Sequence, residues 1–161
     1  MKPLRLLTLS FAGLSLLIAL TGADSTGDKE AARKATREHL RRVLETAGKL
    51  ADVNIKFQQS ETHPYNFVGV IEDGLKHSDS LEVVVGVTAF ETIGFRIYPH
   101  YKGGYINVDK AKDGPALMRQ LLRLTDRNFL YWGIDDTSDV FSGYTVTLES
   151  GFPEEVVLIV L

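Results

Sequence analysis

Cysteine is absent from this chain of 161 residues, and its absence excludes several kinds of chemistry. Disulfides cannot stabilise the fold, no thiolate can act as a nucleophile or a metal ligand, and no N-terminal cysteine can carry a lipid. The folded part must therefore be stable through its hydrophobic core. A chain of this size buries enough apolar surface to do so as a single domain.

Recognisable catalytic and cofactor-binding motifs are also absent. The sequence has no G-x-S-x-G nucleophile elbow, no G-x-G-x-x-G turn and no Walker loop. The four histidines never stand at the spacing of metal ligands, and they are His39, His63, His77 and His100. We therefore predict a protein that is not an enzyme and that has no catalytic residue, no metal and no cofactor.

A long apolar run occurs only near the N-terminus. Leu6 to Leu20 is about 15 residues long, which is shorter than the about 18 that a membrane-spanning helix needs. Lys2 and Arg5 precede this run, and the small residues Thr21-Gly22-Ala23 follow it. This pattern predicts a secretory signal peptide over residues 1–23, and hence an exported protein that is periplasmic or extracellular. An uncleaved membrane anchor is the alternative.

Positive charge is scarce in the predicted mature chain, residues 24–161. All 21 acidic residues but only 16 of the 18 basic residues follow Ala23, which leaves a net charge of −5. A mildly acidic domain has no general attraction for nucleic acid or for anionic lipid. We expect neither nucleic acid nor, after signal cleavage, a membrane among its partners.

Hydrophobic periodicity predicts one helix followed by several strands. After a polar linker at 25–28, apolar residues recur at helical spacing through 29–49 and form a narrow stripe, with the helix ending near Gly48. The period then changes to two, through Ile55–Gln58, 65–71, 81–88 and 92–98, with turn residues between the runs. These runs predict an antiparallel meander with one face buried.

A second helix is predicted to begin at Asp113-Gly114-Pro115, which supplies a capping residue and a proline in the first turn, and to stop at Asn128. Its broad leucine-rich face is expected to cover the sheet. Strands over 129–134 and 140–149 follow. Phe152-Pro153-Glu154-Glu155 then favours a short final helix, although the β-branched residues after it are also compatible with a strand. The order α-β-β-β-α-β-β(-α) predicts an α+β fold, with an antiparallel sheet packed with helices.

Two groups of residues are candidates for function. Asp135, Asp136 and Asp139 could hold a hard cation, but aspartates are also what a tight hairpin turn favours. Tyr98, Tyr101 and Tyr105 surround Pro99 and two glycines, and such tyrosines are typical of binding surfaces. We treat the three tyrosines as candidate partner-binding residues. The alternative is that they cap the end of the core.

The C-terminal half resembles the YbjN family and its type III secretion chaperone-like relatives. The resemblance covers roughly Phe67 to Pro153 and rests on Leu121-Leu122-Arg123-Leu124, Asn128-Phe129, Trp132-Gly133-Ile134-Asp135-Asp136, Asp139-Val140 and Leu148-Glu149. It implies a single non-enzymatic α+β domain over 24–161, with its final helix barely begun. It also implies frequent homodimers, and for the secretion chaperones a role in holding segments of a partner polypeptide.

The sequence thus predicts an exported, non-catalytic protein-interaction module that binds a polypeptide partner or a second copy of itself. Its strands carry apolar residues on both faces, including Val68, Val70, Val84 and Phe141, and one covering helix protects only one face. The alternative from another class is a small exported cation-dependent hydrolase that uses the three aspartates. A purely structural envelope component is a third interpretation.

Overall fold

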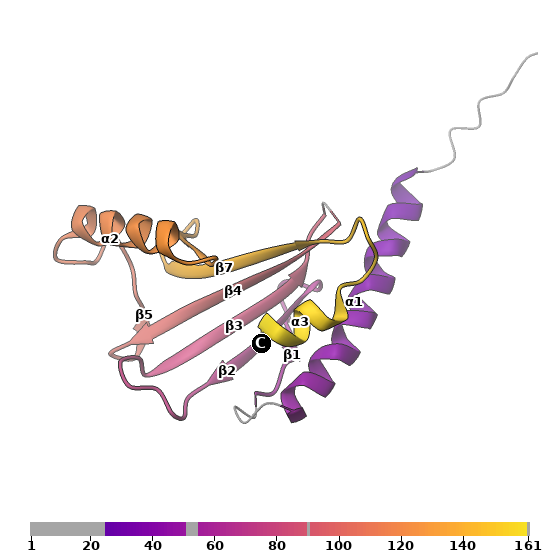
Figure 1. Cartoon of the computed structure of the whole chain (residues 1–161), viewed down its shortest axis with the longest axis horizontal. Helices are drawn as coiled ribbons and strands as arrows, with labels where there is room; N and C mark the ends of the chain where they lie inside the picture. The colour runs from indigo at the N-terminus through magenta and orange to yellow at the C-terminus, as the bar shows by residue number, and fades with distance from the viewer. Residues whose placement is uncertain (1–24, 51–54, 90, 161) are drawn as a thin grey trace, which may run out of the picture.

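The computed structural model describes residues 25–50, 55–89 and 91–160 (Figure 1). The predicted signal peptide and its cleavage site lie outside these residues. Within the described ranges, no helix combines the length and the hydropathy that crossing a membrane requires.

The fold is α+β, with a seven-stranded antiparallel sheet and three helices in the described residues. The strands lie side by side in the order β1-β2-β3-β4-β7-β6, and β5 pairs with the end of β4. Their bounds are β1 Gln58–Gln59, β2 Asn66–Ile71, β3 Ser80–Val87, β4 Thr92–Tyr101, β5 Gly104–Tyr105, β6 Tyr131–Ile134 and β7 Val140–Thr147. The helices are α1 Ser25–Leu50, α2 Gly114–Arg127 and α3 Glu154–Val160. The predicted fold class and antiparallel sheet are confirmed.

One face of the sheet, which we call the core face, carries the hydrophobic core. The strand register places Phe67 opposite Val85, Val85 opposite Phe95 and Phe95 opposite Tyr144, so the alternate residues of four strands meet on this face. Phe67, Val85 and Phe95 are all buried. These alternating buried residues confirm the prediction that one face of the sheet is buried.

Helices α1 and α3 cover part of this face, and the prediction that the second helix does so is wrong. Leu40 and Leu44 of α1 and Val157 of α3 are fully buried in the core. In α2, by contrast, Leu121 is the buried residue, and Leu122 is 62% exposed.

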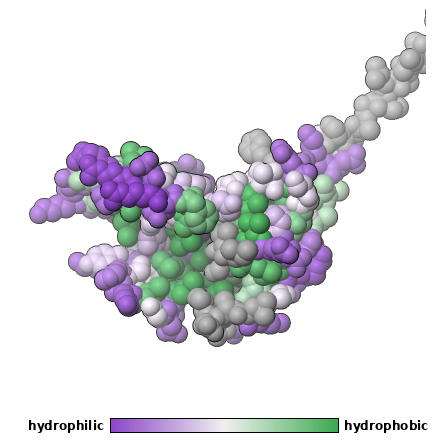
Figure 2. Space-filling view, in the orientation of Figure 1, coloured by the Kyte–Doolittle hydropathy of each residue, from purple (hydrophilic) through white to green (hydrophobic). Residues whose placement is uncertain are grey.

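The position of α2 follows from its connection to the next strand. Only residues 128–130 separate α2 from β6, which lies at the edge of the sheet, so the helix must stay beside that edge. The hydroxyl of Thr125 accepts a hydrogen bond from the backbone N–H of Trp132 at 2.8 Å, which joins the two elements. Figure 1 shows α2 at the opposite end of the sheet from α1 and α3. Hydrophobic residues gather over the strands between α2 and α3 (Figure 2).

Several predicted boundaries shift. Residues 25–28 belong to α1 rather than to a linker, and α1 continues past Gly48 to Leu50. The first predicted strand is reduced to β1, while Ile55 is buried in the core. The β6 strand begins at Tyr131, two residues later than predicted.

The predicted caps of α2 are confirmed, and so is the short final helix. The Asp113 carboxylate accepts a hydrogen bond from the backbone N–H of Ala116 at 2.8 Å, and Asn128 occupies the C-cap. At the other end of the chain, Glu154 and Glu155 form the first turn of α3, where the helix dipole favours negative charge.

Candidate functional site

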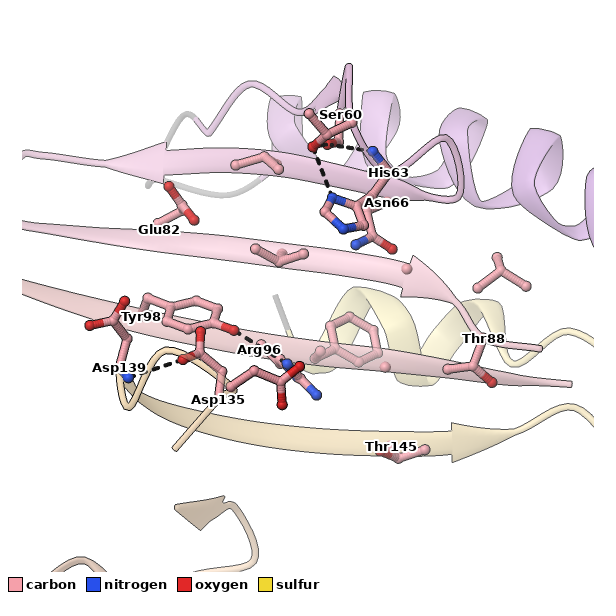
Figure 3. Close-up of a pocket in the computed structure, with 18 of the residues that line it drawn as sticks. Ser60, His63, Asn66, Glu82, Thr88, Arg96, Tyr98, Asp135, Asp139 and Thr145 are labelled. Carbon is pink, nitrogen blue, oxygen red and sulfur yellow. Dashed lines mark hydrogen bonds between the residues drawn. The ribbon is translucent and has the colours of Figure 1, made fainter. Parts of the chain in front are cut away.

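The second face of the sheet, which we call the open face, is not covered by any helix among the described residues. In Figure 3 its side chains point toward the viewer, and α1 and α3 lie behind the strands. A hollow with a volume of about 780 Å³ extends over this face. Its lining comes from Arg33 of α1, the loop before β2, the strands β2 to β7 and the turn before β7.

Aromatic rings form the floor at one end of the open face. Tyr98 is buried, and its ring centroid lies 5.7 Å from that of Tyr105 and 5.6 Å from that of Phe141. Tyr131 contacts Phe141 edge-on, at 6.0 Å between ring centroids. Tyr105 and Tyr131 are 43% and 38% exposed, so this cluster offers apolar surface to a ligand.

The structure brings together two of the three candidate tyrosines. Tyr98 and Tyr105 meet on the open face, but Tyr101 is an odd number of residues from Tyr98 along β4 and so points to the opposite side. Tyr101 is 54% exposed and lies under the ammonium of Lys102. Lys102 and Gly103 both have positive φ, at 56° and 79°, which makes the β4–β5 connection a two-residue hairpin turn.

Arg96 lies near the middle of the open face and was not singled out from the sequence. Its guanidinium carbon is 4.5 Å from the ring centroid of Phe141, and its Nη1 is 3.4 Å from the hydroxyl of Tyr98 (Figure 3). In the part of the chain that the structure describes, Arg96 has no carboxylate within ion-pair distance. A single arginine at a polar position of a strand carries no distinctive signal in a sequence.

The acidic cluster forms a tight turn between β6 and β7. The carboxylate of Asp135 accepts hydrogen bonds from the N–H and hydroxyl of Thr137, at 3.0 and 2.8 Å, and from the N–H of Asp139 at 3.0 Å. Ser138 has a φ of 65°, as expected of the last residue in a three-residue hairpin loop. These contacts match the turn interpretation of the aspartates.

The turn also sets the charge state of Asp135. Burial raises the pKa of its carboxyl, but the hydrogen bonds from Thr137, Asp139 and Tyr98 outweigh burial, and the pKa lies below its usual range. Asp135 therefore stays ionised at neutral pH. Among the described residues, no group of three acidic or histidine side chains is arranged to hold a metal ion. The cation-dependent hydrolase gains no support from this geometry.

Four carboxylates line one half of the hollow, and we call this region the acidic half: Glu82, Asp135, Asp136 and Asp139. The hydroxyl of Tyr105 donates a hydrogen bond to Glu82 at 3.0 Å. Burial, this hydrogen bond and the negative charges of Glu82 and Asp139 raise the pKa of Tyr105 to about 12. Within the described ranges, none of the four carboxylates is ion-paired with a lysine or an arginine.

The other half of the hollow is polar and mostly uncharged. Ser60, Thr62 and His63 come from the loop before β2, and Asn66 lies over Gly86 of the neighbouring strand. Arg33 of α1 closes this end, where its guanidinium donates to the carbonyl of Val87 at 2.8 Å. The open face thus has an acidic, aromatic half and a neutral, polar half.

Comparison with known proteins yields no assignment. No protein-family model, no curated protein and no solved structure matches this chain.

Proposed function

We propose that this protein is an exported, non-catalytic interaction module, and that a polypeptide partner or a second copy docks on the open face of its sheet. The observation that carries the proposal is a sheet with helices against one face and apolar residues on both. Val70 is 45% exposed on the open face, and Val68 and Val84 are half-buried beside it. A sheet face of this kind is normally packed against a second layer.

The composition of the open face supports the same proposal. Aromatic residues and arginine are enriched in protein interfaces, and Tyr105, Tyr131 and Arg96 all line the hollow. Their rings and the guanidinium are held by contacts to Phe141 and Tyr98. Little side-chain entropy is therefore lost when a partner packs against them.

The predicted export signal and a resemblance to a known family complete the proposal. The N-terminal 23 residues have the parts of a secretory signal, and the resemblance of the C-terminal half to the YbjN family favours a domain that binds polypeptides. The hydrogen-bonded aspartates of the turn are consistent with a structural rather than a catalytic use of that cluster.

Site-specific crosslinking tests the proposal. A photoreactive amino acid replaces Val84 on the open face, and a matched variant carries it at Thr46, which is exposed on α1. We expect polypeptide adducts from position 84 and far fewer from position 46. Val70→Arg, introduced into the first variant, should abolish these adducts because it places a long charged side chain on the same face.

Sedimentation of the exported protein distinguishes the two kinds of partner. A second copy as partner predicts a monomer–dimer equilibrium that Val70→Arg shifts to monomer. The proposal would be wrong if the protein stayed monomeric at high concentration and position 84 gave no more adducts than position 46.

A further inference from the structure

We infer that the occupant of the open face is an extended polypeptide segment with lysine or arginine side chains, which it places over the acidic half. This inference rests on the proposed function and adds the chemistry of the partner. It follows from the charge and the aromatic surface of the face.

The charge of the acidic half is not neutralised within the described part of the protein. Its four carboxylates face one cation, Arg96, and that guanidinium lies over the ring of Phe141 without an ion-pair partner. Burial is the largest cause of the raised pKa of Tyr105, and the hydrogen bond to Glu82 and the charges of Glu82 and Asp139 raise it further. A basic segment would supply the missing positive charge, whereas an acidic segment would be repelled.

The aromatic rings of this half suit the side chains of lysine and arginine. Tyr105 and Tyr131 each leave more than a third of their surface exposed beside the carboxylates, at 43% and 38%. The alkyl stem of a lysine or arginine can pack on such rings while its charged group reaches an acid. Arg96 over Phe141 already shows this kind of contact on the same face.

The charge of the face favours a basic segment over a second copy of the protein. A second copy would bring its own acidic half and the same net charge, so the two open faces would repel each other.

Binding of short labelled peptides tests the inference. The probe is a fluorescein-labelled peptide of repeated Lys-Val-Gly units, about ten residues long so that its extended form matches β4. Peptides of Ser-Val-Gly and Glu-Val-Gly units serve as neutral and acidic counterparts. We expect fluorescence anisotropy to show the highest affinity for the basic peptide, a lower affinity for the neutral peptide and the lowest for the acidic peptide. Added salt should weaken binding of the basic peptide.

A pair of matched variants locates the binding. Glu82→Gln with Asp136→Asn removes two charges from the acidic half and leaves the turn residues Asp135 and Asp139 in place. The control, Glu72→Gln with Asp126→Asn, removes two exposed acids that do not line the hollow. The first variant should weaken binding of the basic peptide by about three- to ten-fold and the control should leave it unchanged.

The possible results separate this inference from the proposed function. Equal affinity for the basic and neutral peptides would overturn the preference for basic segments but leave polypeptide binding intact. Equal weakening by both variants would show a general charge effect and would also overturn it. A wild-type dimer that the basic peptide dissociates would assign the face to a second copy. Failure of every peptide to bind would count against both proposals.

Discussion

At the scale of single residues, glycines on β6 and β7 allow aromatic side chains to lie flat on the open face. Tyr131 lies over Gly143 on the neighbouring strand, and Phe141 lies over Gly133 in the same way. A Cβ atom added to Gly143 would stand 2.7 Å from Cζ of the Tyr131 ring. The glycines therefore shape the open face, because a larger residue would displace the rings above them.

The first prediction concerns Gly143. We expect Gly143→Ala to lower the free energy of unfolding by about 1–3 kcal/mol, because Tyr131 must move to admit the new methyl group. Urea unfolding measures the change. The control is Gly104→Ala, also in a strand, where an added Cβ meets no atom within 4 Å. Equal stability of the two variants would contradict the packing described here.

The second prediction concerns Tyr105 and pH. Its pKa of about 12 is above its usual value, so the fold favours the neutral phenol. The stability that this phenol contributes is fully present below the ordinary pKa of about 10, and it is lost as the pH rises toward the raised value. In an ultraviolet titration, the Tyr105→Phe variant should therefore lack one tyrosine that ionises only at high pH.

Glu82→Gln provides the check on this assignment. Removing the negative charge beside the phenol should lower the pKa of Tyr105 toward its ordinary value, because burial alone then remains as the main cause of the shift. If Tyr105→Phe instead removes a tyrosine that ionises near the ordinary pKa, and Glu82→Gln leaves the titration curve unchanged, Tyr105 ionises like an exposed tyrosine.

At the scale of secondary-structure elements, the width of a helix's apolar face did not predict whether that helix packs on the core face. The narrow stripe of α1 is buried in the core, at Leu40, Val43, Leu44 and Ala47, while the broader face of α2 leaves Leu122 exposed. Periodicity indicates which side of a helix is apolar, but the chain connections decide what that side can reach. The short loop to β6 holds α2 at the edge of the sheet.

The third prediction compares these two helices. Leu44→Ala should lower the free energy of unfolding by about 2–5 kcal/mol, since it opens a cavity in the core. Leu122→Ala makes the same chemical change at an exposed site and should stay within about 0.5 kcal/mol of the wild type. Thermal or urea unfolding compares them. A larger loss of stability in Leu122→Ala than in Leu44→Ala would instead support the prediction that the second helix covers the sheet.

At the scale of the whole molecule, the two faces of the sheet differ in what packs against them. The core face holds the protein together through α1 and α3. The open face presents aromatic rings, together with a guanidinium and carboxylates that have no ion-pair partners in the described residues. Since the chain has no cysteine to form a disulfide, the stability of the fold depends on the core face.

The fourth prediction concerns the mature chain. N-terminal sequencing of the protein after export should begin at Asp24, because small residues end the apolar segment at Ala23. Intact mass measurement gives an independent check on the same product. Recovery of the protein with residues 1–23 attached, in a membrane fraction, would instead support the uncleaved anchor.

Local features of the fold were determined by the sequence alone. Four of these features depend on neighbours within a few residues: the alternation through β3 and β4, the Asp113 cap of α2, the hairpin at Asp135–Asp139 and the final helix. Interactions between residues that are close in sequence produce a recognisable order of residue types, which is why these elements could be predicted.

Only the tertiary structure decided which helix covers the sheet and which residues share the open face. Arg96 and Tyr98 share β4, but Glu82 and Asp135 come from other segments and join them only because β4 pairs with β3 and β7. The position of α2 likewise depends on where β6 lies in the sheet. Strand order and helix docking are set by packing between distant parts of the chain, which local periodicity does not encode.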